Sequence, residues 1–304
     1  MNILITGAYG FLGRNVAKEY KAAGNHVVGI GHGKWYVEEF SKWGIDQWHE
    51  TTITFEALIN INREFDLIVH CGGSGSVAFS HDNPYEDFQK SVQSTLSLLE
   101  FIRLRNPTCK FIYPSSPAVQ GDLGKVAIKE DMVSMPVSPY GFHKKIAEEL
   151  CYSYYKNFNI SVGIVRYFSI YGEGLQKQLL YDACKKIQNS SGDVTFFGTG
   201  KETRDWIHVS DAAALLYSFA IQLDGFQIIN GGSGTSIEIK HVIHELCKHF
   251  NKPLNVIFNG STKEGDPIHF WAEVSKASAL GWQPKVDIKA GLKRYVDYFN
   301  TLTN

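Results

Sequence analysis

Short apolar runs alternate with longer helical patterns in the first half of this chain, and this alternation limits its fold more than any other feature. The strand-like runs are residues 2–7, 26–31, 66–71, 110–115 and 161–168. The helical patterns cover residues 12–23, 55–63, 85–105 and 139–158. Because the runs are continuously apolar, the strands they predict are buried on both faces, with helices as crossovers. The sequence therefore predicts an α/β protein with a Rossmann-type doubly wound parallel sheet.

The pattern changes after about residue 168 to shorter, mixed segments punctuated by glycine, such as "FFGTGKETRD" and "NGGSGTS". Such segments predict a smaller C-terminal α/β domain at the carboxyl edge of the sheet. The larger domain is predicted to comprise residues 1–168 with about 205–230. The smaller one comprises residues 169–204 and 231–304.

The charge balance limits the kinds of partner that the protein can bind, and the cysteines indicate its cellular compartment. Thirty Lys and Arg residues face 31 Asp and Glu residues, a formal net charge of −1, so no overall field attracts nucleic acid or an anionic membrane. No apolar run approaches the roughly 18 residues of a membrane span. Five widely spaced cysteines without a Cys-x-x-Cys pair predict a reduced, cytoplasmic protein. The histidines of "HVIHELCKHF" fit no known ligand spacing, so no metal is predicted.

The segment "TGAYGFLG", residues 6–13, joins the first predicted strand to the first predicted helix. Gly7 can form the tight turn, Gly10 lets the backbone approach a pyrophosphate, and Gly13 lets the helix pack on the strand. The helix N-terminus then faces the anion. Tight turns alone can require such glycines, but a position between strand and helix indicates dinucleotide binding.

The segment "SPYGFHKK" places Tyr140 and Lys144 four residues apart. On a helix these side chains share a face and can point at one ligand. A phenol is a poor base at pH 7, but a neighbouring ammonium favours the phenolate. Tyr140 could then exchange a proton with a sugar hydroxyl or carbonyl. Taken alone, the pair is better interpreted as an exposed surface tyrosine and a lysine that caps nothing.

The Gly-x-x-Gly-x-x-Gly loop and Tyr-x-x-x-Lys pair together resemble the extended short-chain dehydrogenase/reductase superfamily, which includes sugar-nucleotide epimerases, dehydratases and reductases. The resemblance covers almost the whole chain. Further similar segments follow in order: "IVHCGGSGSV", "YPSSPAVQG", "RYFSIYGEG", "GTGKETRDWIHVSD", "NGGSGTSI", "KEGD" and "LGWQP".

The resemblance implies roles for individual residues. The catalytic residues would be Ser116, Tyr140 and Lys144. With Tyr140 and Lys144, the cofactor contacts would be Gly7, Tyr9, Gly10, Phe11, Leu12, Gly13, Arg14, His32, Lys34, Cys71, Gly72 and Ser115. The substrate, a nucleotide-diphosphate sugar, would contact Ser76, Ser116, Ser169, Phe197, Arg204 and Lys263. At three positions, Ser91, Ser169 and Lys263, the residue differs from the one usual in the family.

The two residues after Ser116 narrow the reaction. The family's 4,6-dehydratases carry Asp-Glu there to remove water, whereas this chain has Pro117 and Ala118. The enzymes that epimerise C3 and C5 place a cysteine at the position of Pro117. The resemblance therefore argues against both reactions.

The end of the second predicted strand bears on the cofactor. NAD-binding members place an acidic residue there for the ribose hydroxyls, but this chain has Gly31. Gly31 leaves room for a 2′-phosphate, and His32, Lys34 and Arg14 are cations near enough in sequence to meet it. The sequence thus favours NADP(H), with NAD(H) possible.

A preference for NADP makes a 4-keto sugar-nucleotide reductase the first expectation, because net reductases draw on NADPH. An NAD-dependent nucleotide-sugar 4-epimerase needs the same three catalytic residues and is the close alternative. A non-catalytic dinucleotide-sensing protein is a third. The resemblance also implies a homodimer through helices 85–105 and 139–158, since both look more apolar than one buried face requires.

Overall fold

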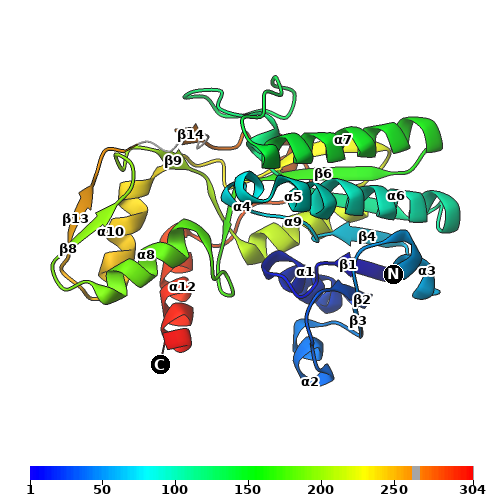
Figure 1. The fold of residues 1–304 in the computed structure, drawn as a ribbon, viewed down its shortest axis with the longest axis horizontal. Coiled ribbons are helices and arrows are strands. Elements are labelled where there is room, and N and C mark those ends of the chain that lie inside the picture. Colours follow the sequence, from blue (N-terminus) through cyan, green and yellow to red (C-terminus); the bar gives the residue numbers. More distant parts are fainter. Residues whose placement is uncertain (262–267, 304) are drawn as a thin grey trace.

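The computed structural model describes residues 1–261 and 268–303. In this part of the chain, a seven-stranded sheet has the order β11-β6-β5-β4-β1-β2-β3 (Figure 1). All its strand pairs are parallel. The strands are β1 (Asn2–Thr6), β2 (His26–Gly31), β3 (Gln47–Glu50), β4 (Leu67–His70), β5 (Lys110–Ser115), β6 (Val162–Tyr167) and β11 (Phe226–Gly231). The predicted doubly wound sheet is confirmed, with β3 and β11 added to the five strands predicted above.

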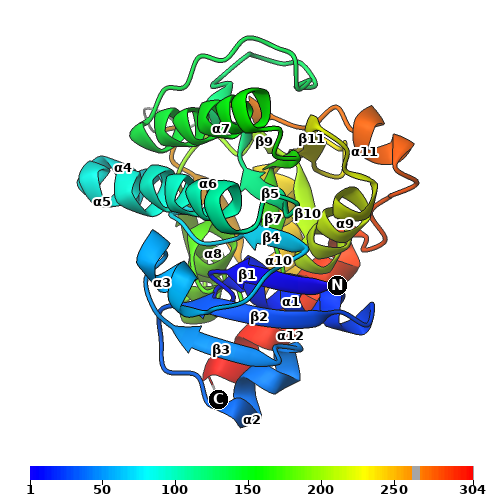
Figure 2. The ribbon, with the colours of Figure 1, turned by 90° about the vertical axis from the view of Figure 1, so that its right-hand side faces the viewer.

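Helices cover both faces of this sheet because successive strand residues point to opposite sides. Ile3 and Ile5 belong to the core under α1 (Phe11–Ala22) and α9 (Val209–Gln222). Leu4 belongs to the core on the other face. The helices that cover this second core are α3 (Phe55–Asn60), α6 (Ser94–Arg105) and α7 (Pro139–Phe158). Both views show α6 and α7 side by side (Figures 1 and 2).

The helix predicted over residues 85–105 is divided in the structure. It consists of α5 (Pro84–Phe88), a π-helical turn η2 (Gln89–Gln93) and α6, preceded by the short helix α4 (Val77–Asp82). The helix predicted over residues 139–158, in contrast, is α7 at its predicted bounds. Its ends carry strong local signals. Ser138 caps its N-terminus with Pro139 in the first turn, and Asn159 ends it in a left-handed conformation.

A smaller α/β lobe stands beside the carboxyl ends of the strands (Figure 1, left). Its core is formed mainly by apolar side chains of α8 (Gln178–Asn189), β8 (Asp193–Phe196), α10 (Ile239–His249) and α12 (Ile288–Thr303). The strand β13 (Asn255–Phe258) pairs with β8. Other pairs join β7 (Ser169–Tyr171) to β10 (Trp206–His208), and β9 (Thr203–Arg204) to β12 (Ile237–Glu238) and β14 (His269–Phe270). The remaining short helices are α2 (Val37–Phe40), η1 (Ser41–Trp43), η3 (Pro117–Val119) and α11 (Ser275–Ala279).

Asp205, between β9 and β10, holds three segments together. Its fully buried carboxylate accepts hydrogen bonds from the backbone N–H groups of Ser233 (2.6 Å), Gly234 (2.9 Å) and Ala272 (3.1 Å). Burial raises the pKa of Asp205, and these hydrogen bonds oppose the rise. Within residues 1–261 and 268–303, none of the helices has both the length and the apolar character that crossing a lipid bilayer requires.

Candidate active site

Two glycines of the loop between β1 and α1, Gly7 and Gly13, lie too close to neighbouring backbone to carry a side chain. Gly7 has a φ of +64°, and a Cβ there would lie 2.6 Å from the backbone N of Gly72. A Cβ on Gly13 would lie 2.3 Å from the Gly7 carbonyl oxygen. The N-cap residue of α1, Gly10, supplies no side-chain cap to the first N–H groups of the helix. This cradle fits the pyrophosphate of a dinucleotide, because uncapped N–H groups at a helix N-terminus bind anions.

A buried hydrogen-bond chain fixes the second edge of this cradle. Thr6 Oγ1 lies 2.6 Å from His70 Nδ1 and accepts a bond from the backbone N–H of Gly72 at 3.1 Å. Burial lowers the pKa of His70 to about 3, and the nearby Lys144 charge adds to this effect. Neutral His70 therefore holds the end of β4, and with it the predicted cofactor residues Cys71 and Gly72, against β1.

The end of β2 is occupied by aromatic rings. A Cβ on Gly31 would lie 3.1 Å from the Trp48 ring, and the N–H of that ring donates to the Gly33 carbonyl at 3.3 Å. Trp35 meets the rings of Tyr9 and Trp48 edge to face, at centroid distances of 5.1 and 5.3 Å. The room that the sequence predicted beside Gly31 is thus narrowed by Trp48.

Arg14, His32 and Lys34, the three cations predicted to meet a 2′-phosphate at the end of β2, differ in their surroundings. The guanidinium of Arg14 lies 5.3 Å from the Tyr9 ring centre, 5.7 Å from Trp35 and 5.1 Å from Trp43, and its Nη2 donates to the Tyr9 carbonyl. Burial lowers the pKa of Arg14. Arg14 therefore packs against the aromatic cluster, whereas the side chains of His32 and Lys34 are exposed. Sequence reasoning missed this cluster because its rings come from separate segments.

The three predicted catalytic residues come together at the N-terminus of α7. Ser116 Oγ accepts a hydrogen bond from the Ala118 N–H at 3.2 Å and lies near enough to the Tyr140 hydroxyl to lower its pKa. Lys144 is buried, with its Nζ 5.9 Å from the Tyr140 ring centre and 4.5 Å from that of Tyr113. The Tyr140 backbone N–H donates to Ser80 Oγ at 3.0 Å, which ties the start of α7 to α4.

The burial of Tyr140 and Lys144 disfavours the charged form of each. Burial raises the pKa of Tyr140 to about 12, although the nearby Ser116 hydroxyl opposes the rise. Burial also lowers the pKa of Lys144 to about 8, against the influence of nearby Glu148. At neutral pH Tyr140 is thus a phenol in these surroundings, and its ionisation needs further positive charge nearby.

Ser115 has a different partner from its neighbour Ser116. Its Oγ is buried and donates to Glu148 Oε1 at 2.6 Å. Glu148 forms a two-point ion pair with Arg166 on β6, at 3.1 and 2.7 Å. The hydroxyl of Ser115 therefore belongs to a buried polar network beneath the site.

The predicted substrate residues lie on separate elements of the fold. Ser76 caps α4 by accepting a bond from the Phe79 N–H at 3.2 Å, and Ser169 begins β7. Phe197 is 68% exposed. Arg204 Nη1 donates to its neighbour's carbonyl, that of Thr203, at 2.9 Å. Lys263 lies outside the described residues.

Sequence reasoning missed Gln178 and Lys177, two residues that approach the loop after β4. Gln178 Nε2 donates to the Gly75 carbonyl at 3.0 Å. The Nζ of Lys177 lies 3.6 Å from the position that a Cβ on Gly75 would take, and burial lowers the pKa of this lysine. Both residues belong to the segment "GEGLQKQ", but only the fold brings this segment to the loop after β4.

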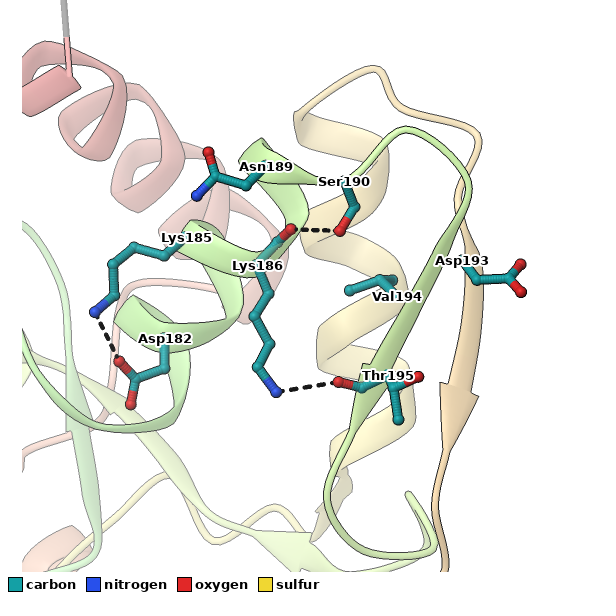
Figure 3. Close-up of a pocket in the computed structure, with 8 residues that line it drawn as sticks. All are labelled: Asp182, Lys185, Lys186, Asn189, Ser190, Asp193, Val194 and Thr195. Carbon is teal, nitrogen blue, oxygen red and sulfur yellow. Dashed lines mark hydrogen bonds and ion pairs between the residues drawn. The ribbon is translucent and has the colours of Figure 1, made fainter.

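A hollow elsewhere in the smaller lobe has no predicted site residue in its lining. Figure 3 shows its lining residues, Asp182, Lys185, Lys186, Asn189, Ser190, Asp193, Val194 and Thr195. Lys185 pairs with Asp182 at 3.2 Å, and Lys186 Nζ donates to the Thr195 carbonyl at 3.1 Å. These cations therefore already have partners. Among the described residues, no group of three or more His, Cys, Asp or Glu side chains is arranged to hold a metal ion.

Comparisons with known proteins agree with this geometry. The chain is 28% identical to the UDP-glucuronate 4-epimerase of Thermodesulfobacterium geofontis, over 97% of this chain and 95% of that protein. It is 27% identical to the CDP-paratose 2-epimerase of Salmonella typhi, over 99% and 100%. The structure of the UDP-glucuronic acid 4-epimerase from Bacillus cereus, in complex with UDP-glucuronic acid and NAD, matches with a TM-score of 0.87 at 29% identity, over 99% and 100%.

These relatives are nucleotide-sugar epimerases, so the comparisons favour the epimerase alternative over the reductase that the sequence put first. They do not support the preference for NADP, because the Bacillus cereus enzyme was solved with NAD. The model of the NAD dependent epimerase/dehydratase family matches residues 3–230. The chain is an enzyme and belongs to the NAD dependent epimerase/dehydratase family.

Proposed function

We propose that this protein is an NAD(H)-dependent 4-epimerase of a UDP-sugar. The observation that carries the proposal is the approach of Ser116, Tyr140 and Lys144 at the start of α7, beside a glycine cradle in which Gly7 and Gly13 leave no room for a side chain. The similarity to two UDP-glucuronate 4-epimerases over almost the whole chain supports the same reaction.

In this proposal each catalytic residue has one task. Tyr140 takes the proton of the sugar C4 hydroxyl and later returns it, and Ser116 holds the reacting oxygen by hydrogen bond. Lys144 supplies positive charge beside Tyr140 and binds the cofactor ribose. The dinucleotide, when bound, supplies the chemistry of removing and returning the hydride at C4.

The choice of NAD(H) rests on the aromatic cluster at the end of β2. The side chain of Arg14 is engaged with Tyr9, Trp35 and Trp43, and Trp48 narrows the space beside Gly31. A 2′-phosphate would thus meet only the exposed side chains of His32 and Lys34 among the three cations considered. Exposed cations contribute little because water screens them.

We infer that the two sides of the site follow the predicted domains. Residues 1–168 and about 205–230 would hold the dinucleotide, and residues 169–204 and 231–304 would hold the sugar nucleotide. Lys177 would then face the substrate from the smaller lobe, as a cation near Gly75.

The proposal is tested by two measurements on the purified protein. Denaturation should release NAD(H) and no NADP(H), identified by mass spectrometry. Incubation with UDP-glucuronate or UDP-glucose should then yield the C4 epimer, seen by NMR, without net consumption of a dinucleotide. Steady oxidation of NADPH with a 4-keto sugar nucleotide, and no epimer from any UDP-sugar, would instead establish the reductase.

A further inference from the structure

A buried acid–imidazole pair lies beside the proposed catalytic residues. Asp87, near the end of α5, has a fully buried side chain. Its Oδ2 lies 2.5 Å from Nδ1 of His143 on α7. Its second oxygen, Oδ1, has no hydrogen-bond partner among the described residues. A buried carboxylate oxygen without a partner is uncommon, and such groups often have a functional reason.

The pair is close enough to act on the catalytic residues. His143 directly precedes Lys144 in α7 and follows Tyr140 by three residues, so it lies within one helical turn of both. After burial, the charge of Asp87 is a further cause that raises the pKa of Tyr140. It also raises the pKa of Lys144, behind the larger effects of burial and Glu148. The π-helical turn η2 begins two residues after Asp87, and such turns are frequent at functional sites.

The ring of His143 also contacts Phe88, edge to face at a centroid distance of 5.5 Å. Charged groups on α5, α6 and β6, which pack against α7, have partners: Glu86 with Lys90 (2.6 Å), Glu100 with Arg103 (2.7 Å), and Arg166 with Glu148 (2.7 Å). Arg105, at the end of α6, is exposed. The two on α4, His81 and Asp82, are exposed. Asp87 is thus the buried charge that faces His143.

Without a positive charge beside it, the negative charge of Asp87 would oppose the ionisation of Tyr140 on which the proposed reaction depends. A carboxylate near Tyr140 disfavours its phenolate, which is the form that accepts a proton from a sugar hydroxyl. We propose that His143, protonated on both ring nitrogens, balances the charge of Asp87 and thereby lets Tyr140 ionise. His143 and Asp87 are therefore positioning residues that act through Tyr140. This inference rests on the proton-transfer role proposed for Tyr140.

The test measures the ionisation of Tyr140 directly. Protein labelled with ¹³C at tyrosine Cζ is titrated with pH in the presence of saturating NAD⁺, and the Tyr140 signal is assigned by its loss in Tyr140→Phe. His143→Asn keeps a hydrogen-bond donor but removes the positive charge. We expect it to raise the titration midpoint of Tyr140 by about one pH unit, the smaller end of the usual effect of a neighbouring charge.

The double variant separates charge balance from a structural role. Asp87→Asn with His143→Asn removes both charges, so the midpoint should return to within about 0.3 pH units of the wild-type value. Circular dichroism checks that each variant is folded, and His143→Gln replaces His143→Asn if the latter does not fold. An unchanged midpoint in the His143 variant, or a double variant shifted as far as the single one, would overturn the proposal. A wild-type Tyr140 that remains a phenol at every pH of the titration would also overturn the proposal.

This readout needs no sugar, so it stands even if the protein does not epimerise UDP-sugars. If the protein does epimerise UDP-sugars, the acidic limb of its profile of kcat against pH should move with the titration midpoint of Tyr140. A rate that is lowered equally at every pH, with an unmoved midpoint, would identify a purely structural pair and contradict the inference.

Discussion

The Nζ of Lys144 donates a hydrogen bond to the Pro114 carbonyl oxygen at 3.0 Å, which ties the first turns of α7 to the end of β5. Ser116 follows β5 by one residue, so the same contact sets the distance between strand and helix at the proposed catalytic site. The catalytic geometry is therefore part of the packing of α7 on the sheet.

Replacing Tyr140 with phenylalanine should lower kcat by about a hundredfold or more, because this is the scale of lost acid–base catalysis. NAD binding, measured by calorimetry, should change little, since the ring remains. Tyr152→Phe is the matched control, because Tyr152 is an exposed tyrosine on the same helix. Equal rates for Tyr140→Phe and the control would exclude Tyr140 as the acid–base group.

Replacing Lys144 with methionine should make the protein more stable at pH 7. Burial lowers the pKa of Lys144 from 10.5 to about 8, so below pH 8 the fold must hold a charge that its surroundings disfavour. Between about pH 8 and 10.5 the unfolded chain binds more protons than the native one, and wild-type stability rises with pH. The advantage of the variant in thermal unfolding should therefore shrink across this window. An advantage that grew with pH would contradict the assigned shift.

Replacing Glu148 with glutamine should lower the free energy of unfolding by about 3 kcal/mol, because it leaves the buried Arg166 charge without its carboxylate. Urea unfolding measures the change. Asp182→Asn removes the exposed partner of Lys185 and should cost less than about 1 kcal/mol. Similar losses in the two variants would mean that burial of the Glu148 pair is unimportant.

The predicted homodimer can be tested by a substitution on α7. Apolar side chains remain exposed on α5 and α7, among them Tyr85 (73%), Phe142 (52%) and Ile146 (40%). Ile146→Glu should place a charge in the predicted interface and give a monomer by light scattering. Ile257→Glu, on β13 of the smaller lobe, is the control and should leave the dimer intact. A wild-type monomer at micromolar concentration would rule out this assembly.

Several elements could be predicted from the sequence because their causes are local. The bounds of α7 follow from Ser138, Pro139 and Asn159, which act within one turn of its ends. The pairing of Tyr140 with Lys144 follows from the helical repeat. Strand β3, with the sequence "QWHE", carries no such signal, since it is defined by its pairing with β2 at the sheet edge.

Only the tertiary structure decided the surroundings of these residues. Arg14 was expected to face a phosphate, but Trp35 and Trp43, more than twenty positions away along the chain, come to lie beside it. Asp87 and His143 are 56 residues apart and meet because α5 packs on α7. The sequence determined which side chains can do chemistry and which local segments present them. Burial and long-range contacts decided their partners and their access to solvent, because both depend on what the rest of the chain places around each group.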